Sequence, residues 1–171
     1  MQDVSGVPAL ETERLRLEPL TAAHADEMAP LLDDPTLHTY VGGAPLSLDE
    51  LLARYARQEG GLSPDGRERW LNWICRERRS GVAVGFAQAT VDEDAGYAEV
   101  AWVIGSAYQG RGYAAEAAAM MVARLGDAGI RVIVAHIHPD NAASAGVARA
   151  TGLTATSVVV DGETRWERTL A

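Results

Sequence analysis

A turn containing two glycines, at residues 109–114, is the first place where residue types and spacing point to chemistry. The segment Gln109–Ala114 (QGRGYA) stands between an apolar stretch expected to form a strand and an alanine-rich stretch expected to form a helix. Gly110 and Gly112 let the backbone turn tightly and keep side chains out of the way. The free N–H groups and the dipole of a helix start favour an anion. The segment therefore predicts a phosphate cradle, and the alternative is a plain glycine turn before a helix.

The same letters also satisfy the dinucleotide pattern G-x-G-x-x-A through Gly110, Gly112 and Ala115. Three features argue against a nicotinamide or flavin site. The preceding strand belongs to an expected antiparallel run, and Ser106–Gln109 separates it from the first glycine. No acid stands at the end of the next strand, because Asp140 comes later, beyond a proline. The dinucleotide site is therefore the less favoured alternative.

Hydrophobic periodicity predicts which elements position this turn. The expected strands are residues 13–18, 69–77, 81–92, 96–105, 131–137, 153–160 and 163–170, the last two joined by a turn at Asp161-Gly162. The first expected helix begins after Thr21, and the second runs from a capping box at Ser47 and Glu50 to Gly60. Two further helices are expected at residues 114–126 and 142–151. This order predicts an α/β fold with a mixed, mostly antiparallel central sheet, helices on both faces and one late parallel crossover. No linker or repeat divides the chain, so residues 1–171 are expected to form a single domain.

Composition narrows the expected partners and location. The 171 residues carry 15 basic and 24 acidic side chains, for a formal net charge of −9, and no base is lysine. An acidic surface repels phosphate backbones and attracts cations, so we expect no nucleic acid, and an amine or a basic peptide is electrostatically favoured. No signal peptide or membrane-spanning run is visible, and the lone Cys75 lies in an apolar stretch. These features predict a cytoplasmic protein without a membrane partner.

Two motifs and the opening segment carry a family resemblance. Gln109–Ala114 resembles the Q/R-x-x-G-x-G/A signature of the GNAT acyltransferases, with Ala114 as its final small residue. His138–Ser144 (HPDNAAS), continuing to Thr151-Gly152-Leu153, resembles the N-x-x-S…G-F/L stretch of the same family. The opening LETERLRLEPL is similar to the first strand of the branch that contains the ribosomal-protein alanine acetyltransferases. The resemblance spans nearly the whole chain and implies the GNAT fold.

The resemblance also implies an N-acetyltransferase that uses acetyl-CoA as co-substrate. The coenzyme pyrophosphate is expected on the N–H groups of residues 110–114, and the pantetheine arm between the strands ending near Ile104 and Ile137. The implied cofactor-binding residues are Trp102, Val103, Ile104, Gln109, Gly110, Arg111, Gly112, Tyr113, Ala114, Asn141 and Ser144. Asn141 would hold the pantetheine arm, a backbone N–H near residues 102–104 would stabilise the oxyanion, and Tyr113 would form a wall of the groove.

Amide formation needs a base, because an amine with a pKa near ~10.4 arrives protonated, and it needs a proton donor for the departing thiolate. Glu99 stands at a position that resembles the glutamate of many relatives, so we predict it as the base, acting through water. Ser144 is the predicted donor. The alternatives are a solvated strand carboxylate and a helix-surface serine. If both are inert, the chain would be a module that binds coenzyme A without catalysis.

The remaining expectations concern metals, acceptor and assembly. His136, His138 and Asp140 spell H-x-H-x-D, but Pro139 redirects the chain before the aspartate, so we expect no metal site and place His138 near the substrate mouth. The resemblance implies that the loop at residues 33–47 and the terminal hairpin select the amine acceptor. That acceptor is a protein N-terminus or a small amine. A homodimer is common in such folds.

Overall fold

The computed structural model describes residues 6–171. Residues 1–5, which open the segment expected to hold no signal peptide, lie outside the described residues. The strands are β1 (Leu10–Glu11), β2 (Leu15–Pro19), β3 (Glu68–Glu77), β4 (Ala83–Asp92), β5 (Tyr97–Ile104), β6 (Val132–Ile137), β7 (Thr154–Val160) and β8 (Glu163–Thr169). The helices are α1 (Ala25–Leu32), α2 (Leu48–Glu59), α3 (Tyr113–Asp127) and α4 (Ala142–Ala150), with short 3-10 turns η1 (Ala22–His24), η2 (Pro35–His38) and η3 (Ser106–Tyr108). The predicted order of strands and helices is confirmed, and the two-residue β1 precedes it.

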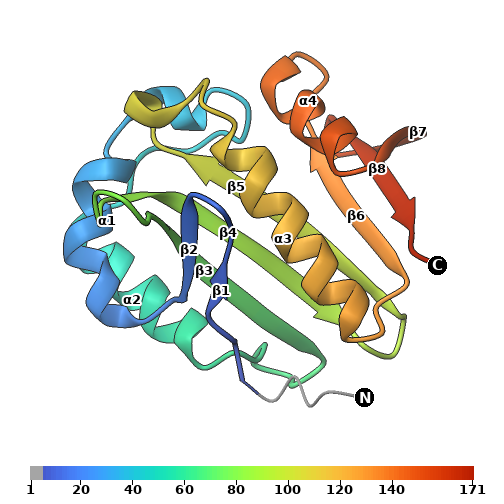
Figure 1. The fold of residues 1–171 in the computed structure, drawn as a ribbon, viewed down its shortest axis with the longest axis horizontal. Helices are drawn as coiled ribbons and strands as arrows, with labels where there is room; N and C mark the ends of the chain where they lie inside the picture. Colours follow the sequence, from blue (N-terminus) through green and yellow to red (C-terminus); the bar gives the residue numbers. More distant parts are fainter. Residues whose placement is uncertain (1–5) are drawn as a thin grey trace.

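One eight-stranded sheet holds all these strands, in the order β1-β2-β3-β4-β5-β6-β8-β7. Every neighbouring pair is antiparallel except β5 and β6, which are parallel and are joined through α3. The mixed sheet with a late crossover is therefore confirmed. In Figure 1, α3 crosses one face of the sheet, and α1 and α2 lie against the other.

Two separate cores explain why the helices occupy both faces. Alternate strand residues such as Trp73 and Ile133 pack with Met121 of α3, and all three are fully buried. The intervening residues, among them Ile74, pack instead with Met28 of α1. Because successive strand residues point to opposite faces, this alternation assigns every sheet residue to the α3 face or to the α2 face.

Local sequence signals decide where the helices begin. Ser47 Oγ accepts the Glu50 N–H at 3.2 Å, and the Glu50 carboxylate accepts the Ser47 N–H, so the predicted capping box opens α2. At the first helix the prediction was less exact. Thr21 caps the 3-10 turn η1, and regular α-helix begins only at Ala25. His24 Nδ1 accepts the Thr21 N–H at 3.0 Å, so these two residues form a capping box on the 3-10 turn.

Cys75 is fully buried in β3, and burial raises the pKa of its thiol to about 12. A thiol with that pKa supplies almost no thiolate near neutral pH, so Cys75 is a packing residue, as predicted. No helix within residues 6–171 is long and apolar enough to span a bilayer.

Tyr55 of α2 is 3% exposed, and its hydroxyl makes no hydrogen bond within the described residues. Burial raises the pKa of this hydroxyl to about 12. An unpaired buried hydroxyl costs stability, so we expect Tyr55→Phe to raise the free energy of unfolding by about 1 kcal/mol. Chemical denaturation with and without the substitution measures the change. A loss of stability would show that the hydroxyl has a bonding partner.

Candidate active site

A notch opens in the sheet between β5 and β6. These strands pair only from Tyr97↔Val132 to Glu99↔Val134, and beyond Glu99 they separate, as Figure 1 shows. β6 remains paired with β8 along its whole length, so its free edge faces the notch. The N–H of Gly105 donates to Val84 on the β4 side. Because N–H directions alternate along a strand, those of Trp102 and Ile104 point toward the notch.

The turn at residues 109–114 lies at the wide end of this notch. Gly110 and Gly112 adopt φ values of 78° and 82°, a left-handed backbone that glycine adopts without strain. Gly112 caps α3, and the first bond of the helix runs from the Glu116 N–H to the Gly112 carbonyl. None of the N–H groups of residues 110–115 donates to an acceptor within residues 6–171. Six consecutive free donors at a helix start fit an anion such as a pyrophosphate.

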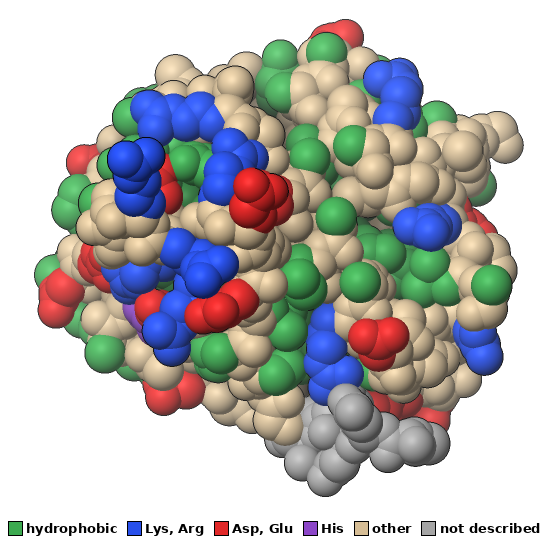
Figure 2. Space-filling model, in the orientation of Figure 1, with side chains coloured by type: hydrophobic (Ala, Val, Ile, Leu, Met, Phe, Trp, Pro, Cys, Tyr) green, Lys and Arg blue, Asp and Glu red, His purple; other side chains and the backbone are tan. Residues whose placement is uncertain are grey.

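Arg14 of the N-terminal segment holds this turn in place. Its Nε donates to Glu116 at 2.8 Å, its Nη1 donates to the Arg111 carbonyl at 2.8 Å, and its guanidinium lies 4.6 Å from the centre of the Tyr113 ring. Burial acts to raise the pKa of Glu116, but hydrogen bonds from Thr12 and Arg14 outweigh it and hold that pKa below its ordinary value. The sequence did not identify this contact, because Arg14 and Glu116 lie 102 positions apart. Figure 2 shows arginine and acidic side chains mixed over this region of the surface.

The other side chains of the turn mostly support the backbone. Gln109 Nε2 donates to the Ile104 carbonyl at 2.9 Å and so ties the turn to the end of β5. The Tyr113 hydroxyl donates to Glu77, and this carboxylate raises the pKa of the tyrosine. Arg111 is exposed, with its guanidinium 5.6 Å from the centre of the Tyr108 ring. Tyr113 is thus buried and hydrogen-bonded to Glu77, and its role as a wall of the groove stays a prediction.

Asn141 and Ser144 begin α4, after the end of β6. Asn141 Oδ1 accepts the Ser144 N–H at 3.1 Å, so the asparagine caps the helix. The amide nitrogen of Asn141 and the hydroxyl of Ser144 make no hydrogen bond within residues 6–171. Ala145 and Ala148 of α4 pack on the same core as α3, so this helix covers the α3 face.

Glu99 lies at the narrow end of the notch, as the last residue of β5 that pairs with β6. Its Oε1 lies 2.9 Å from His136 Nδ1, and about half of its side-chain surface is exposed. The sequence pattern assigned His136 only to the disfavoured metal site, although its period-2 spacing from Val134 could have placed it beside Glu99. Ala98 is buried on the α3 face, so its neighbour Glu99 points to the α2 face. Glu99 therefore lies on the α2 face, whereas α4, which carries Ser144, covers the α3 face.

The loop at residues 33–47 reaches the same notch. Asp34 accepts a hydrogen bond from Ser106 just after β5, and the Tyr40 ring lies 5.2 Å from the His138 ring just after β6. The loop is therefore attached on both sides of the opening, and the place of His138 at the substrate mouth stays a prediction. Within the described part of the chain, no three His, Cys, Asp or Glu side chains form a metal-binding group.

Comparison with known proteins gives one family match. Residues 14–154 match the model described as the acetyltransferase (GNAT) domain. A search of curated proteins by sequence gives no significant match.

Several solved structures share the fold. An acetyltransferase from Agrobacterium tumefaciens is 24% identical, with a TM-score of 0.75 and coverage of 98% of both chains. The microcin C7 self-immunity acetyltransferase MccE, solved with acetyl-CoA and AMP, is 14% identical, with a TM-score of 0.77 and coverage of 93% of this chain and 94% of that one. RimL, the ribosomal L7/L12 α-N-protein acetyltransferase solved with coenzyme A, is 15% identical, with a TM-score of 0.77 and coverage of 95% and 98%.

Proposed function

The chain belongs to the GNAT acetyltransferase family, and from that premise we propose that it transfers an acetyl group from acetyl-CoA directly to a primary amine within a ternary complex. The observation that carries the proposal is the notch, which has free N–H donors at its wide end and the Glu99 carboxylate at its narrow end. We also propose that residues 1–171 form one such domain, because all eight strands in the described residues belong to one sheet.

The residues at the notch fit acetyl-CoA, which supplies an activated acetyl thioester when bound. The N–H groups of residues 110–115 would hold the pyrophosphate, and the free edges of β5 and β6 would pair with the pantetheine arm. The amide nitrogen of Asn141, which makes no hydrogen bond within residues 6–171, would bind the same arm. Arg14 and Gln109 position the turn through Glu116, the Arg111 carbonyl and the Ile104 carbonyl.

Glu99 would take the proton from the incoming amine, through water, and His136 would fix the carboxylate by its contact at 2.9 Å. The N–H groups of Trp102 and Ile104 would stabilise negative charge that develops on the carbonyl oxygen. Ser144 would deliver a proton to the departing sulfur from the opposite face. This division of roles keeps base and acid apart, which suits a reaction that needs both.

Ser144→Ala should lower kcat by roughly 10²–10⁴-fold, the range of general acid catalysis, and should leave the affinity for acetyl-CoA nearly unchanged. The helix should persist because Asn141 remains its cap and alanine is a better helix former. Steady-state kinetics with Ser157→Ala, an exposed strand serine, gives the matched control. An unchanged kcat would assign the proton to solvent, because Glu77 engages the Tyr113 hydroxyl.

An acceptor screen tests the proposed function. The protein is incubated with acetyl-CoA and a panel of amines, including amino acids, polyamines, aminoglycosides and short peptides with free N-termini, and both thioester loss and product mass are followed. We expect amine-dependent thioester loss with one product per acetyl group. Coenzyme binding without transfer to any amine would indicate a sensing module instead. We propose that the acceptor is an amine-bearing small molecule or peptide. We also propose a cytoplasmic location and a homodimer.

A further inference from the structure

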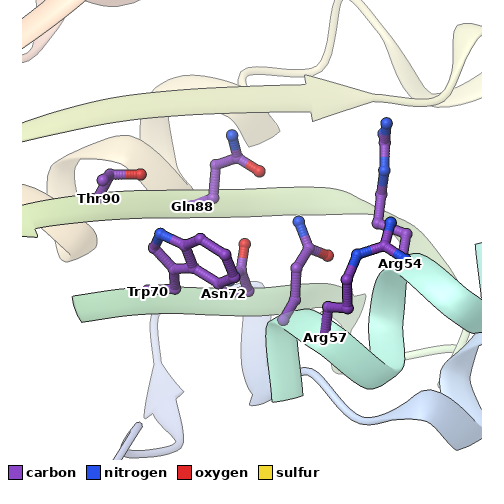
Figure 3. Close-up of a pocket in the computed structure, with 7 residues that line it drawn as sticks. Arg54, Arg57, Trp70, Asn72, Gln88 and Thr90 are labelled. Carbon is purple, nitrogen blue, oxygen red and sulfur yellow. The ribbon is translucent and has the colours of Figure 1, made fainter. Parts of the chain in front are cut away.

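A cavity of about 210 Å³ lies on the α2 face, between α2 and strands β3 and β4. Its lining includes Arg54 and Arg57 from α2, Trp70 and Asn72 from β3, and Gln88 and Thr90 from β4. Figure 3 shows the four strand side chains rising from one face of the sheet, beside the two arginines. The cavity is separate from the phosphate-binding turn, which lies at the start of α3.

The two arginines have no acidic partner within residues 6–171, and no carboxylate lines the cavity. Glu68 of β3 accepts the Trp70 indole N–H at 3.4 Å and does not line the cavity. Arg14, Arg69 and Arg76, by contrast, are all paired with glutamates. Arg54 and Arg57 therefore bring two uncompensated positive charges to a polar cavity.

Asn72 adds an amide to the lining of the cavity. The residue is only 7% exposed, and its side-chain amide makes no hydrogen bond within the described residues. Solvent still reaches this amide, because the Tyr55 hydroxyl is the only fully buried side-chain polar atom without a partner in residues 6–171. The amide is therefore open to a ligand in the cavity. Gln88 lies directly opposite Asn72 in the β3–β4 register, which adds a second amide at the same level.

The cavity is next to the proposed reaction centre. Thr90 lines it and lies directly opposite Glu99 in the β4–β5 register, on the same face. From β3 to β5 is two strand spacings, roughly 10 Å. One acceptor molecule can thus reach both the cavity and the Glu99 carboxylate.

We propose that this cavity binds a carboxylate or phosphate group of the acceptor, whose amine, roughly 10 Å away, is acetylated at the notch. The inference rests on the proposed function and names its substrate class. Two arginines and the Asn72 amide are the donors that recognise such an oxyanion. This class differs from the cationic partner that the net charge of −9 favours, because local charges at a site outweigh a net charge spread over the surface.

Three acceptors that differ only in their far group test the proposal: ω-aminooctanoate, ω-aminooctanamide and diaminooctane. A second set, amidated Ala-Ala-Asp, Ala-Ala-Asn and Ala-Ala-Arg, asks whether a peptide can supply the anion, since three extended residues span about 10 Å. We expect the anionic member of at least one set to have the highest kcat/KM, by about tenfold or more over its neutral partner.

Arg57→Glu should reverse this order, so that the cationic acceptor becomes the preferred one. Arg54→Glu should act in the same direction. Arg124→Glu, on α3 at the opposite face, is the matched control and should leave the order unchanged. These arginines are at the surface, so folding should survive the changes.

Calorimetric binding of ω-aminooctanoate and amidated Ala-Ala-Asp separates this inference from the proposed function. If Arg57→Glu weakens the binding of either probe by about tenfold or more, the result supports the anion site. This holds even if no amine is acetylated, and in that case only the transferase proposal fails. Equal acetylation of all acceptors in both proteins would overturn the anion site and leave the transferase proposal standing. Absence of Arg57-dependent binding for both probes would overturn it too.

Discussion

Glu99→Gln should lower kcat/KM near neutral pH by roughly 10²–10⁴-fold, which corresponds to about 3–5 kcal/mol of transition-state stabilisation. Glutamine keeps the shape of the side chain and can still contact His136, but it cannot accept the proton of the amine. Binding of acetyl-CoA should persist, because the phosphate-binding N–H groups lie at the other end of the notch. A kcat/KM profile from about pH 6 to pH 10, which approaches the amine titration, measures the effect.

The pH dependence of kcat/KM decides whether Glu99 acts as a base or only positions the acceptor. The variant should recover part of its rate at high pH, where free amine exists without a base. Glu167→Gln is the matched control, since Glu167 lies opposite Val134 on the same face and is paired with Arg165. It should change the rate less than about tenfold, as a rim charge does. Parallel curves for Glu99→Gln and the native enzyme would mean that Glu99 only positions the acceptor.

Gly112→Val should abolish acetyl-CoA binding. A side chain there would occupy the cradle between the free N–H groups, and its Cβ would already lie 3.3 Å from Arg14 Nη2. For the native protein, acetyl-CoA at 100 times its Kd adds about 2.7 kcal/mol of stability, a rise in Tm of roughly 5–10 °C for a chain of this size. The variant should lose this rise, as measured by thermal unfolding with and without acetyl-CoA.

A valine at a φ of 82° is itself strained by about 1–3 kcal/mol, so the variant needs a control with the same strain. Gly129→Val provides it. Gly129 has a φ of 92°, follows the other end of α3 and has open space around its Cβ position. It should lose similar stability but keep the acetyl-CoA shift. A native protein that responds to a nicotinamide dinucleotide, and not to acetyl-CoA, would contradict the cofactor proposal.

Local signals in the sequence were enough to predict the fold. The capping box at Ser47, the alternation along β2 and the Asp161-Gly162 turn each act over a few residues, so the sequence displays them directly. Asp161 and Gly162 both adopt positive φ, as a tight hairpin turn requires. The motif at residues 109–114 belongs to the same class, because a helix start and two glycines define it.

Contacts between distant segments could not be predicted in this way. The contacts of Glu99 with His136 and of Glu116 with Arg14 depend on strand register and on the packing of α3, which no short pattern specifies. The unpaired amide of Asn72 is likewise visible only when α2 is seen over β3. The sequence thus supplied candidates for the site, and the three-dimensional arrangement supplied their partners.

The three residue pairs between β5 and β6 also have a mechanical consequence. They are the only backbone ladder within residues 6–171 that joins the strands β1–β5 to the strands β6, β8 and β7, so the sheet consists of two halves with a short seam. On the proposed binding mode, a pantetheine arm that pairs with both free edges extends this ladder. The co-substrate then acts as a temporary strand, and the enzyme is stiffest across its seam when it is loaded and ready to react.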